Sequence, residues 1–202
     1  EFAGQFGYRI KLLAISKHAG GAIEARVHPT MIPEANLLST IGGPLNALTI
    51  AGHAAGEILL YGRGAGMMPT ASAVVGDLVD LARNVACGCP GRVPLLAFQP
   101  DRIGRIPLRP MAEIQTHYYL RTQAQHQPGV PSRVAGILGD LGISIQSVHQ
   151  KGRQSQGTVP VGRMTHLARE ADMQEALRRI HTLGVVEEDP MLIRVEDPNG
   201  QE

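Results

Sequence analysis

Hydrophobic and polar residues alternate along the first part of the chain as they do in β-strands. Residues 8–15, "YRIKLLAI", and residues 22–28, "AIEARVH", both show this period of two, and the turn signal "KHAGG" separates them. The pair predicts an antiparallel hairpin, which Pro29 and Pro33 should end because proline donates no ladder hydrogen bond. In the second segment the apolar side consists of Ile23, Ala25 and Val27, and the polar side of Glu24, Arg26 and His28.

A second hairpin and a helix follow. Residues 45–52, "LNALTIAG", and residues 57–62, "EILLYG", flank a turn around His53. After them the apolar period changes from two to 3.6, which predicts a helix that ends near Asn84. Its apolar stripe is Ala71, Val74, Val75, Leu78 and Ala82. We therefore expect residues 1–84 to form one module, a mostly antiparallel sheet closed by a helix.

The second half of the chain has a clear order of elements. A strand over residues 118–125 leads into a helix with Pro131 just inside its start and Gly142 just past its end. Two strands, a second helix and a last strand complete the order β-α-β-β-α-β, the ferredoxin-like arrangement. The inward-facing helix residues are expected to be Val130, Val134, Ile137, Leu138 and Leu141, and then Met173, Ala176, Leu177 and Ile180. The uncovered face or edge of such a sheet is usually paired with a second copy, so we expect a homo-oligomer.

The predicted fold class is α+β, with two modules and a connector. Residues 85–116 are rich in Pro, Gly and Arg, show no sustained period and form the connector. Residues 117–197 form the ferredoxin-like domain, and residues 198–202 a tail. At the other end, Phe2 to Gly7 resembles the last turn of a helix, and the sequence lacks an initiator Met. We interpret the sequence as a piece of a longer protein.

Composition narrows the function classes. The formal net charge of +1 and the 3% aromatic content argue against nucleic acid as a partner. No apolar run reaches membrane-spanning length and no leader is recognisable, so we expect a cytoplasmic protein. Cys87 and Cys89, in "CGCP", have no second cysteine pair with which to hold a metal and are interpreted as reduced thiols.

The most distinctive stretch is "YGRGAGMMPTASAVVGDLVDL", which begins at Tyr61. Glycines that lead into a helix start can accept an anion through free backbone N–H groups, and Thr70 is a candidate cap of that helix. The spacing is not that of the G-x-G-x-x-G fingerprint. From the residues alone, both a structural turn and a cofactor contact stay open.

Other polar residues have plainer interpretations. His28 and His53 have no Ser, Cys or Asp at useful spacing, which favours surface or packing roles over catalysis. Asn46 is expected to make structural hydrogen bonds. Asp77 and Asp80 are expected to lie on a solvated helix face.

With both modules placed, the chain resembles the C-terminal half of a homoserine dehydrogenase that carries an ACT domain. In the first module the resemblance rests on "GYRIKLLAI", "VHPTMIP", "GGPLNALTI" and above all "GRGAGMMPTASAVVGDLVDLAR". In the second it rests on "YYLR", "PGVPSRVAGILGDLGISIQSVHQ" and "MTHLAREADMQEALRRI". It runs from Phe6 to about Asp197.

The resemblance implies an oxidoreductase that uses NADP or NAD to interconvert L-homoserine and L-aspartate 4-semialdehyde, on the route to threonine, methionine and isoleucine. In this family the nucleotide-binding domain and the catalytic lysine and carboxylates come earlier in the chain, and no lysine here matches that lysine. No catalytic residue is therefore assigned, and the chain alone is expected to be inactive. The resemblance places Gly66, with Gly64 and Ala65, at the wall of the cofactor site.

The resemblance also implies an amino-acid effector, with threonine as the candidate. ACT domains usually hold it at the turn before their first helix, which makes Gly129 and Val130 candidates, with Ile145 facing them. His126 stands where ACT loops commonly have an acid. Two other functions stay open: an ACT protein that senses an amino acid and controls a partner, and a dimerising fragment.

Overall fold

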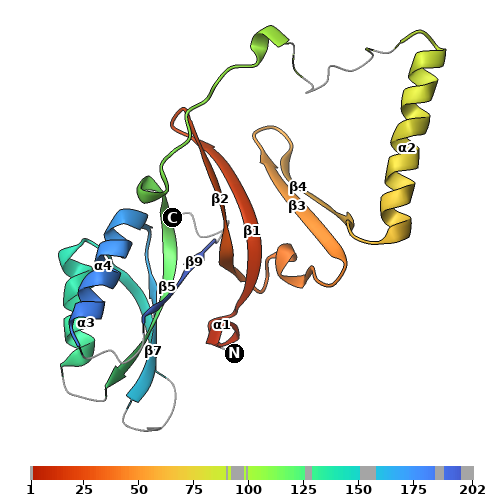
Figure 1. Ribbon diagram of the computed structural model, residues 1–202. Coiled ribbons are helices and arrows are strands. Elements are labelled where there is room, and N and C mark those ends of the chain that lie inside the picture. Colours follow the sequence, from red (N-terminus) through yellow and green to blue (C-terminus); the bar gives the residue numbers. More distant parts are fainter. Residues whose placement is uncertain are drawn as a thin grey trace. The chain divides into compact units, whose positions relative to one another are not determined.

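The computed structural model describes residues 2–89, 91, 98, 100–125, 129–150, 158–184 and 189–196 (Figure 1). The chain divides into two compact units, Glu1–Ser39 with Ile106–Glu202, and Thr40–Arg105. These units do not coincide with the predicted boundaries at 84/85 and 116/117. The reason is that the first hairpin adds its strands to the sheet of the second module.

The first unit is built on one mixed sheet with the order β1-β2-β9-β5-β7-β6, and β8 also pairs with β5. The two strands of the N-terminal hairpin are antiparallel over their whole length. The hairpin joins the rest of the sheet through a short parallel pairing of Thr30 with Arg194 and of Met31 with Val195. The strands are β1 (Tyr8–Ala19), β2 (Ala22–Pro33), β5 (Gln115–Gln125), β6 (Ile145–Gln150), β7 (Thr158–Thr165), β8 (Ala168–Arg169) and β9 (Met191–Val195).

The predicted β-α-β-β-α-β order is confirmed. Helices α3 (Val130–Asp140) and α4 (Glu170–Thr182) lie together on one face of the sheet (Figure 1). They bury the apolar stripes expected from the sequence, because side chains three and four residues apart share one helix face. The core beneath them contains Tyr118, Leu120, Val134, Leu138, Ile143, Ala168, Met173, Ala176 and Ile180. Gly142 follows α3 with φ 69°, as predicted for a helix end.

The opposite face of this sheet is covered in part by the start of the chain. The short helix α1 (Phe2–Gln5) and Phe6 pack against a cluster that contains Met31, Tyr119, Met164 and Val195. The ring of Phe6 meets that of Tyr119 edge-on, with centroids 5.4 Å apart. The first residues of the chain thus partly cover the sheet face for which the sequence predicted a second copy of the chain as cover.

Strand β2 differs from expectation in two ways. It runs through Pro29 to Pro33, although Pro29 was predicted to end the hairpin. Alternate residues of an antiparallel strand point their N–H away from the partner strand. On that side β2 pairs with β9 at Thr30 and Met31 and bridges Leu108 at Ile23, but Pro29 has no ladder partner there, so the proline is tolerated. Its polar side is also the buried one, with Glu24, Arg26, His28 and Thr30 enclosed while Val27 is 69% exposed.

The second unit contains a hairpin and a long helix. Strand β3 (Leu45–Gly52) has the predicted bounds, and β4 (Gly56–Arg63) pairs with it antiparallel. Helix α2 (Met67–Ala86) buries none of its residues within the described chain. No described helix is both long and apolar enough to cross a membrane. Short 3-10 turns at Leu37–Thr40, Pro100–Arg102 and Met111–Glu113 complete the described elements.

Candidate functional site

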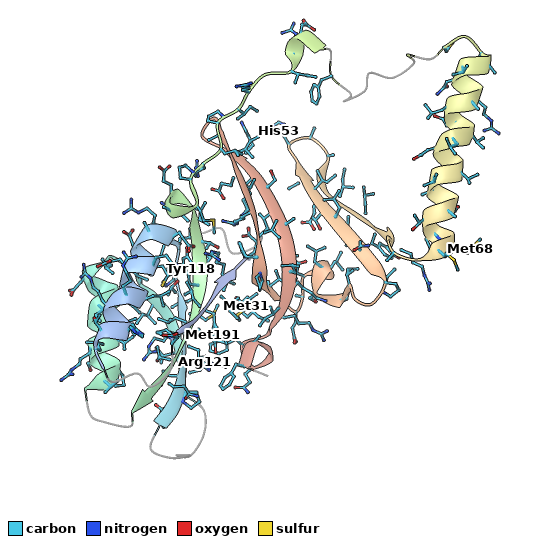
Figure 2. All side chains as sticks on the ribbon, in the orientation of Figure 1. Met31, His53, Met68, Tyr118, Arg121 and Met191 are labelled. Carbon is cyan, nitrogen blue, oxygen red and sulfur yellow. The ribbon has the colours of Figure 1, made fainter. Side chains whose placement is uncertain are left out.

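The glycine loop joins the end of β4 to the start of α2. Gly66 is the residue just before the helix and has φ 124° and ψ 147°, a conformation that essentially only glycine adopts. No side chain caps the helix there, and the N–H of Thr70 donates to Gly66 O at 3.1 Å. The helix thus begins at Met67, so the prediction that Thr70 caps it was wrong: Thr70 lies inside its first turn. Met68, labelled in Figure 2, marks this helix start.

Gly64 is required for a different reason. A Cβ built on Gly64 would lie 1.9 Å from Nδ2 of Asn46, whose backbone pairs with Gly62 in the ladder. The amide of Asn46 therefore lies directly against the loop backbone. This close approach leaves no room for a side chain at position 64, and the structural hydrogen bonds expected of Asn46 stay a prediction.

An open hollow of about 350 Å³ adjoins the loop, lined by residues 46–48 and 60–64 of the hairpin. Four aliphatic side chains, each 41–55% exposed, continue the same hairpin face: Leu48, Ile50, Ile58 and Leu60. Gly64, Ala65 and Gly66 lie together in one exposed turn at the end of this face. Their contact with a cofactor stays a prediction.

Two of the predicted effector residues, Gly129 and Val130, lie at the start of α3, whereas Ile145 is the first residue of β6. Gly129 precedes the helix in the left-handed conformation, with φ 90°, and no side chain caps the helix. The side chain of Val130 is buried, and Ile145 packs against the domain core. These two side chains are thus used for packing, which leaves backbone N–H groups as the donors that a ligand would meet. His126 lies outside the described residues.

A buried polar cluster, which the sequence did not flag, centres on Glu170 at the start of α4. Arg194 Nε and Tyr118 Oη each donate to Glu170 Oε2 at 2.8 Å, and Gln174 donates to Oε1 at 2.8 Å. Burial alone would raise the pKa of Glu170, but these hydrogen bonds lower it below its usual range. Burial, with the bond to Glu170, raises the pKa of Tyr118.

The same cluster extends along the buried side of β2. Arg26 donates to Glu196 at 2.8 Å, Lys17 pairs with the same carboxylate, and Arg109 donates to Glu24 at 2.9 Å. His28 lies among these groups; burial, and repulsion from Arg194 and Arg26, lower its pKa. The sequence signal for this cluster was the charged side of residues 22–28, but alternation does not say which side is buried.

The other polar candidates lie where the sequence suggested. His53 is exposed in the β3–β4 turn (Figure 2), and Asp77 and Asp80 are exposed on α2. Cys87 and Cys89 are exposed free thiols. The described residues include no group of three or more His, Cys, Asp and Glu side chains placed to hold a metal ion.

Comparison with known proteins bears on both units. Residues 1–79 match the homoserine dehydrogenase family, and residues 118–185 match the ACT domain family. The homoserine dehydrogenase of Neisseria gonorrhoeae is 43% identical over 196 residues, which cover 97% of this chain and 45% of that protein. The Helicobacter pylori homoserine dehydrogenase is 39% identical, with 98% of this chain and 45% of that protein covered.

A solved structure extends the match to the fold. The homoserine dehydrogenase of Thiobacillus denitrificans is 44% identical and superposes with a TM-score of 0.86, over 97% of this chain and 44% of that one. The Staphylococcus aureus enzyme, 22% identical with a TM-score of 0.59, shows the fold alone. The chain therefore spans somewhat less than half the length of the relatives it matches.

Proposed function

From the premise that the chain belongs to the homoserine dehydrogenase family, we propose that the complete protein interconverts L-homoserine and L-aspartate 4-semialdehyde with NAD(P). This reaction serves threonine, methionine and isoleucine biosynthesis. The observation that carries the proposal is the β4–α2 loop. Its glycines are required by the backbone conformation at Gly66 and by the approach of Asn46 to Gly64.

The loop suits one wall of a cofactor site. Gly64, Ala65 and Gly66 present backbone rather than bulky side chains, and the N–H groups at a helix start favour a phosphate oxygen. Bound there, the nicotinamide nucleotide would supply the hydride acceptor or donor. The role of these residues is to position it and to exclude water from one side. A side chain at position 66 would strain the backbone of the loop itself, even without a ligand bound.

The second unit also exposes an apolar surface. The hairpin face and α2 expose aliphatic side chains that the described residues do not cover, including Val75 and Leu78 at 57% and 59%. Surfaces of this kind mark interaction sites. In the proposal, the nucleotide-binding part of the complete protein packs on them, so residues 1–202 alone lack turnover.

The ACT domain gives the proposal its regulation. Its sheet and two helices enclose a core of their own, and its helix start at Gly129 offers backbone donors to an amino acid. We assign it threonine feedback in a homo-oligomer. A cytoplasmic location fits the exposed free thiols of Cys87 and Cys89.

A chimera tests the enzyme proposal. The nucleotide-binding part of the Thiobacillus denitrificans relative, placed ahead of residue 1, should give NAD(P)-dependent oxidation of homoserine, followed by the absorbance of the reduced nicotinamide. Residues 1–202 alone should give none. Gly66→Val in the chimera should abolish turnover, while Gly62→Ala, where an added Cβ meets nothing within 4 Å, should preserve it. Turnover by residues 1–202, or full activity of the Gly66→Val chimera, would contradict the proposal.

The completeness of the ACT core favours one alternative, an amino-acid sensor that acts without the enzyme. Calorimetric titration of threonine into residues 1–202, together with the chimera assay, separates the two. Binding with an inactive chimera supports the sensor, and binding with an active, threonine-inhibited chimera supports the regulated enzyme.

A further inference from the structure

Arg163 on β7 is a buried cation without an acidic partner among the described residues. Its side chain is 1% exposed, and no described carboxylate lies within ion-pair distance of it. Its Nη1 donates to Thr122 Oγ1 at 2.8 Å and lies 3.5 Å from Val161 O, whereas its Nη2 is buried without any partner among the described residues. Arginine stays protonated in proteins, so the positive charge remains in the domain interior.

A buried positive charge of this kind costs free energy unless an opposite charge or a polar ligand compensates it. Buried charges in proteins are normally paired, because taking an unpaired ion out of water costs several kcal/mol even after relaxation. Packing alone would favour an apolar side chain here, since Leu120 lies directly across the ladder and belongs to the core. Arg163 thus resembles a site prepared for an anion more than a packing element.

The fold places Arg163 on the side of the sheet that carries the helices. Cross-strand partners share a face, and Leu120, the partner of Arg163, packs beneath α3 and α4. Thr122, which holds Nη1, lies on that face too, towards the end of β5 that precedes α3. The other face is closed at this point, because a Cβ on the neighbouring Gly162 would lie 3.1 Å from Tyr119.

The start of α3 supplies a second set of donors on the same side. Gly129 leads into the helix at φ 90° with no side-chain cap, so the first N–H groups of α3 have no capping acceptor among the described side chains. A helix start and a guanidinium both favour a carboxylate, and the planar guanidinium can bind it through paired N–H groups. Thr122 would hold the guanidinium in place while Nη2 stays available.

We propose that Arg163 receives the carboxylate of a small amino acid between β7 and the start of α3. This inference rests on the regulatory role proposed for the ACT domain, and it assigns the recognition of the ligand's charge to a side chain rather than to the turn alone. Arg163 is a binding residue in this proposal and takes no part in the oxidoreduction.

The test compares L-threonine with L-threoninol, which lacks the carboxylate, by calorimetry on the 202-residue chain. In Arg163→Met we expect threonine binding to weaken roughly tenfold or more, as for loss of a hydrogen bond to a charged group, and threoninol binding to change little. Arg133→Met, which removes an exposed positive charge from the same helix start, should leave both unchanged. Arg163→Lys keeps the charge and serves where Arg163→Met does not fold; it should retain part of the preference for threonine.

The outcomes separate this inference from the proposed function. Equal weakening of both ligands in the Arg163 variants, or of neither, overturns the role of Arg163 and leaves threonine regulation standing. If the unmodified chain binds no threonine, the proposal of threonine feedback is wrong. The carboxylate site at Arg163 is then tested with acetate, by measuring the melting temperature of the chain. A rise with acetate that Arg163→Met removes supports the carboxylate site, and no such rise overturns it.

Discussion

At Gly66 the backbone determines which residue the chain can carry. With φ 124° and ψ 147°, any L side chain is strained, and a Cβ would lie 3.3 Å from Pro69 Cδ. We expect Gly66→Ala to lower the free energy of unfolding by about 1–3 kcal/mol in urea titrations. Gly62→Ala near the end of the adjoining strand β4, with open space around it, should stay within about 0.5 kcal/mol. Equal effects of the two substitutions would mean that the strain does not lie at Gly66.

His28 makes the stability of the chain depend on pH. In the folded protein its pKa is lowered by burial and by Arg194 and Arg26, whereas in the unfolded chain it titrates near 6.5. Below that pH the unfolded state binds the proton more readily, so stability should fall as the pH drops from about 7 to 5. His28→Gln should flatten this part of the curve of unfolding free energy against pH. His166→Gln, at an exposed position, should leave the slope unchanged.

Among elements, α4, β5 and β9 meet at Glu170. Its carboxylate is the common acceptor for Arg194, Tyr118 and Gln174, so removing its charge leaves a largely buried guanidinium without its counter-ion. We expect Glu170→Gln to destabilise the chain at pH 7 by about 3 kcal/mol in urea titrations. The matched control is Glu175→Gln in the same helix. It removes a carboxylate whose arginine partners are solvent-exposed, and such ion pairs contribute about 0–1 kcal/mol.

Glu170 should also make the stability of the chain fall at acidic pH. Because the folded-state pKa of Glu170 is lowered, its contribution is present above the unfolded value near 4.3 and is lost as the pH falls through the folded value. The Glu170→Gln variant should therefore lose less stability than the unmodified chain as the pH falls below about 4.3. An equally steep loss of stability at acidic pH in the variant and the unmodified chain would mean that other carboxylates cause it.

How far the elements follow from the sequence depends on what they pack against. Helices α3 and α4 and strand β3 were predicted well, because each has a local period or turn signals that hold whatever lies nearby. The path of β2 was not, because its buried charged side is paired with Arg109 and Glu196, two residues that are distant in sequence. The glycine loop was found as a motif, but the reason for Gly64, its approach to Asn46, needed the structure.

At the scale of the whole molecule, the two units differ in how much they enclose. The first has a buried core on each face of its sheet, whereas α2 of the second exposes a series of apolar side chains: Met67, Met68, Val74, Val75, Leu78, Val79, Leu81 and Val85. An amphipathic helix gains most of its stability by burying such a stripe. The proposed function gives this stripe a cover, the nucleotide-binding part proposed for the complete protein.

This difference predicts that one substitution has different consequences in two contexts. Leu78→Ser should barely change the stability of residues 1–202, because Leu78 is 59% exposed there. In the chimera with the nucleotide-binding part, where the proposal buries Leu78, it should cost about 2–5 kcal/mol and reduce the active fraction. Asp77→Ser, one position away and off the stripe, should be mild in both, as measured by urea unfolding. Leu78→Ser with the same small effect in both contexts would mean that something other than the nucleotide-binding part covers α2, and a self-associating surface would then be the better account of this helix.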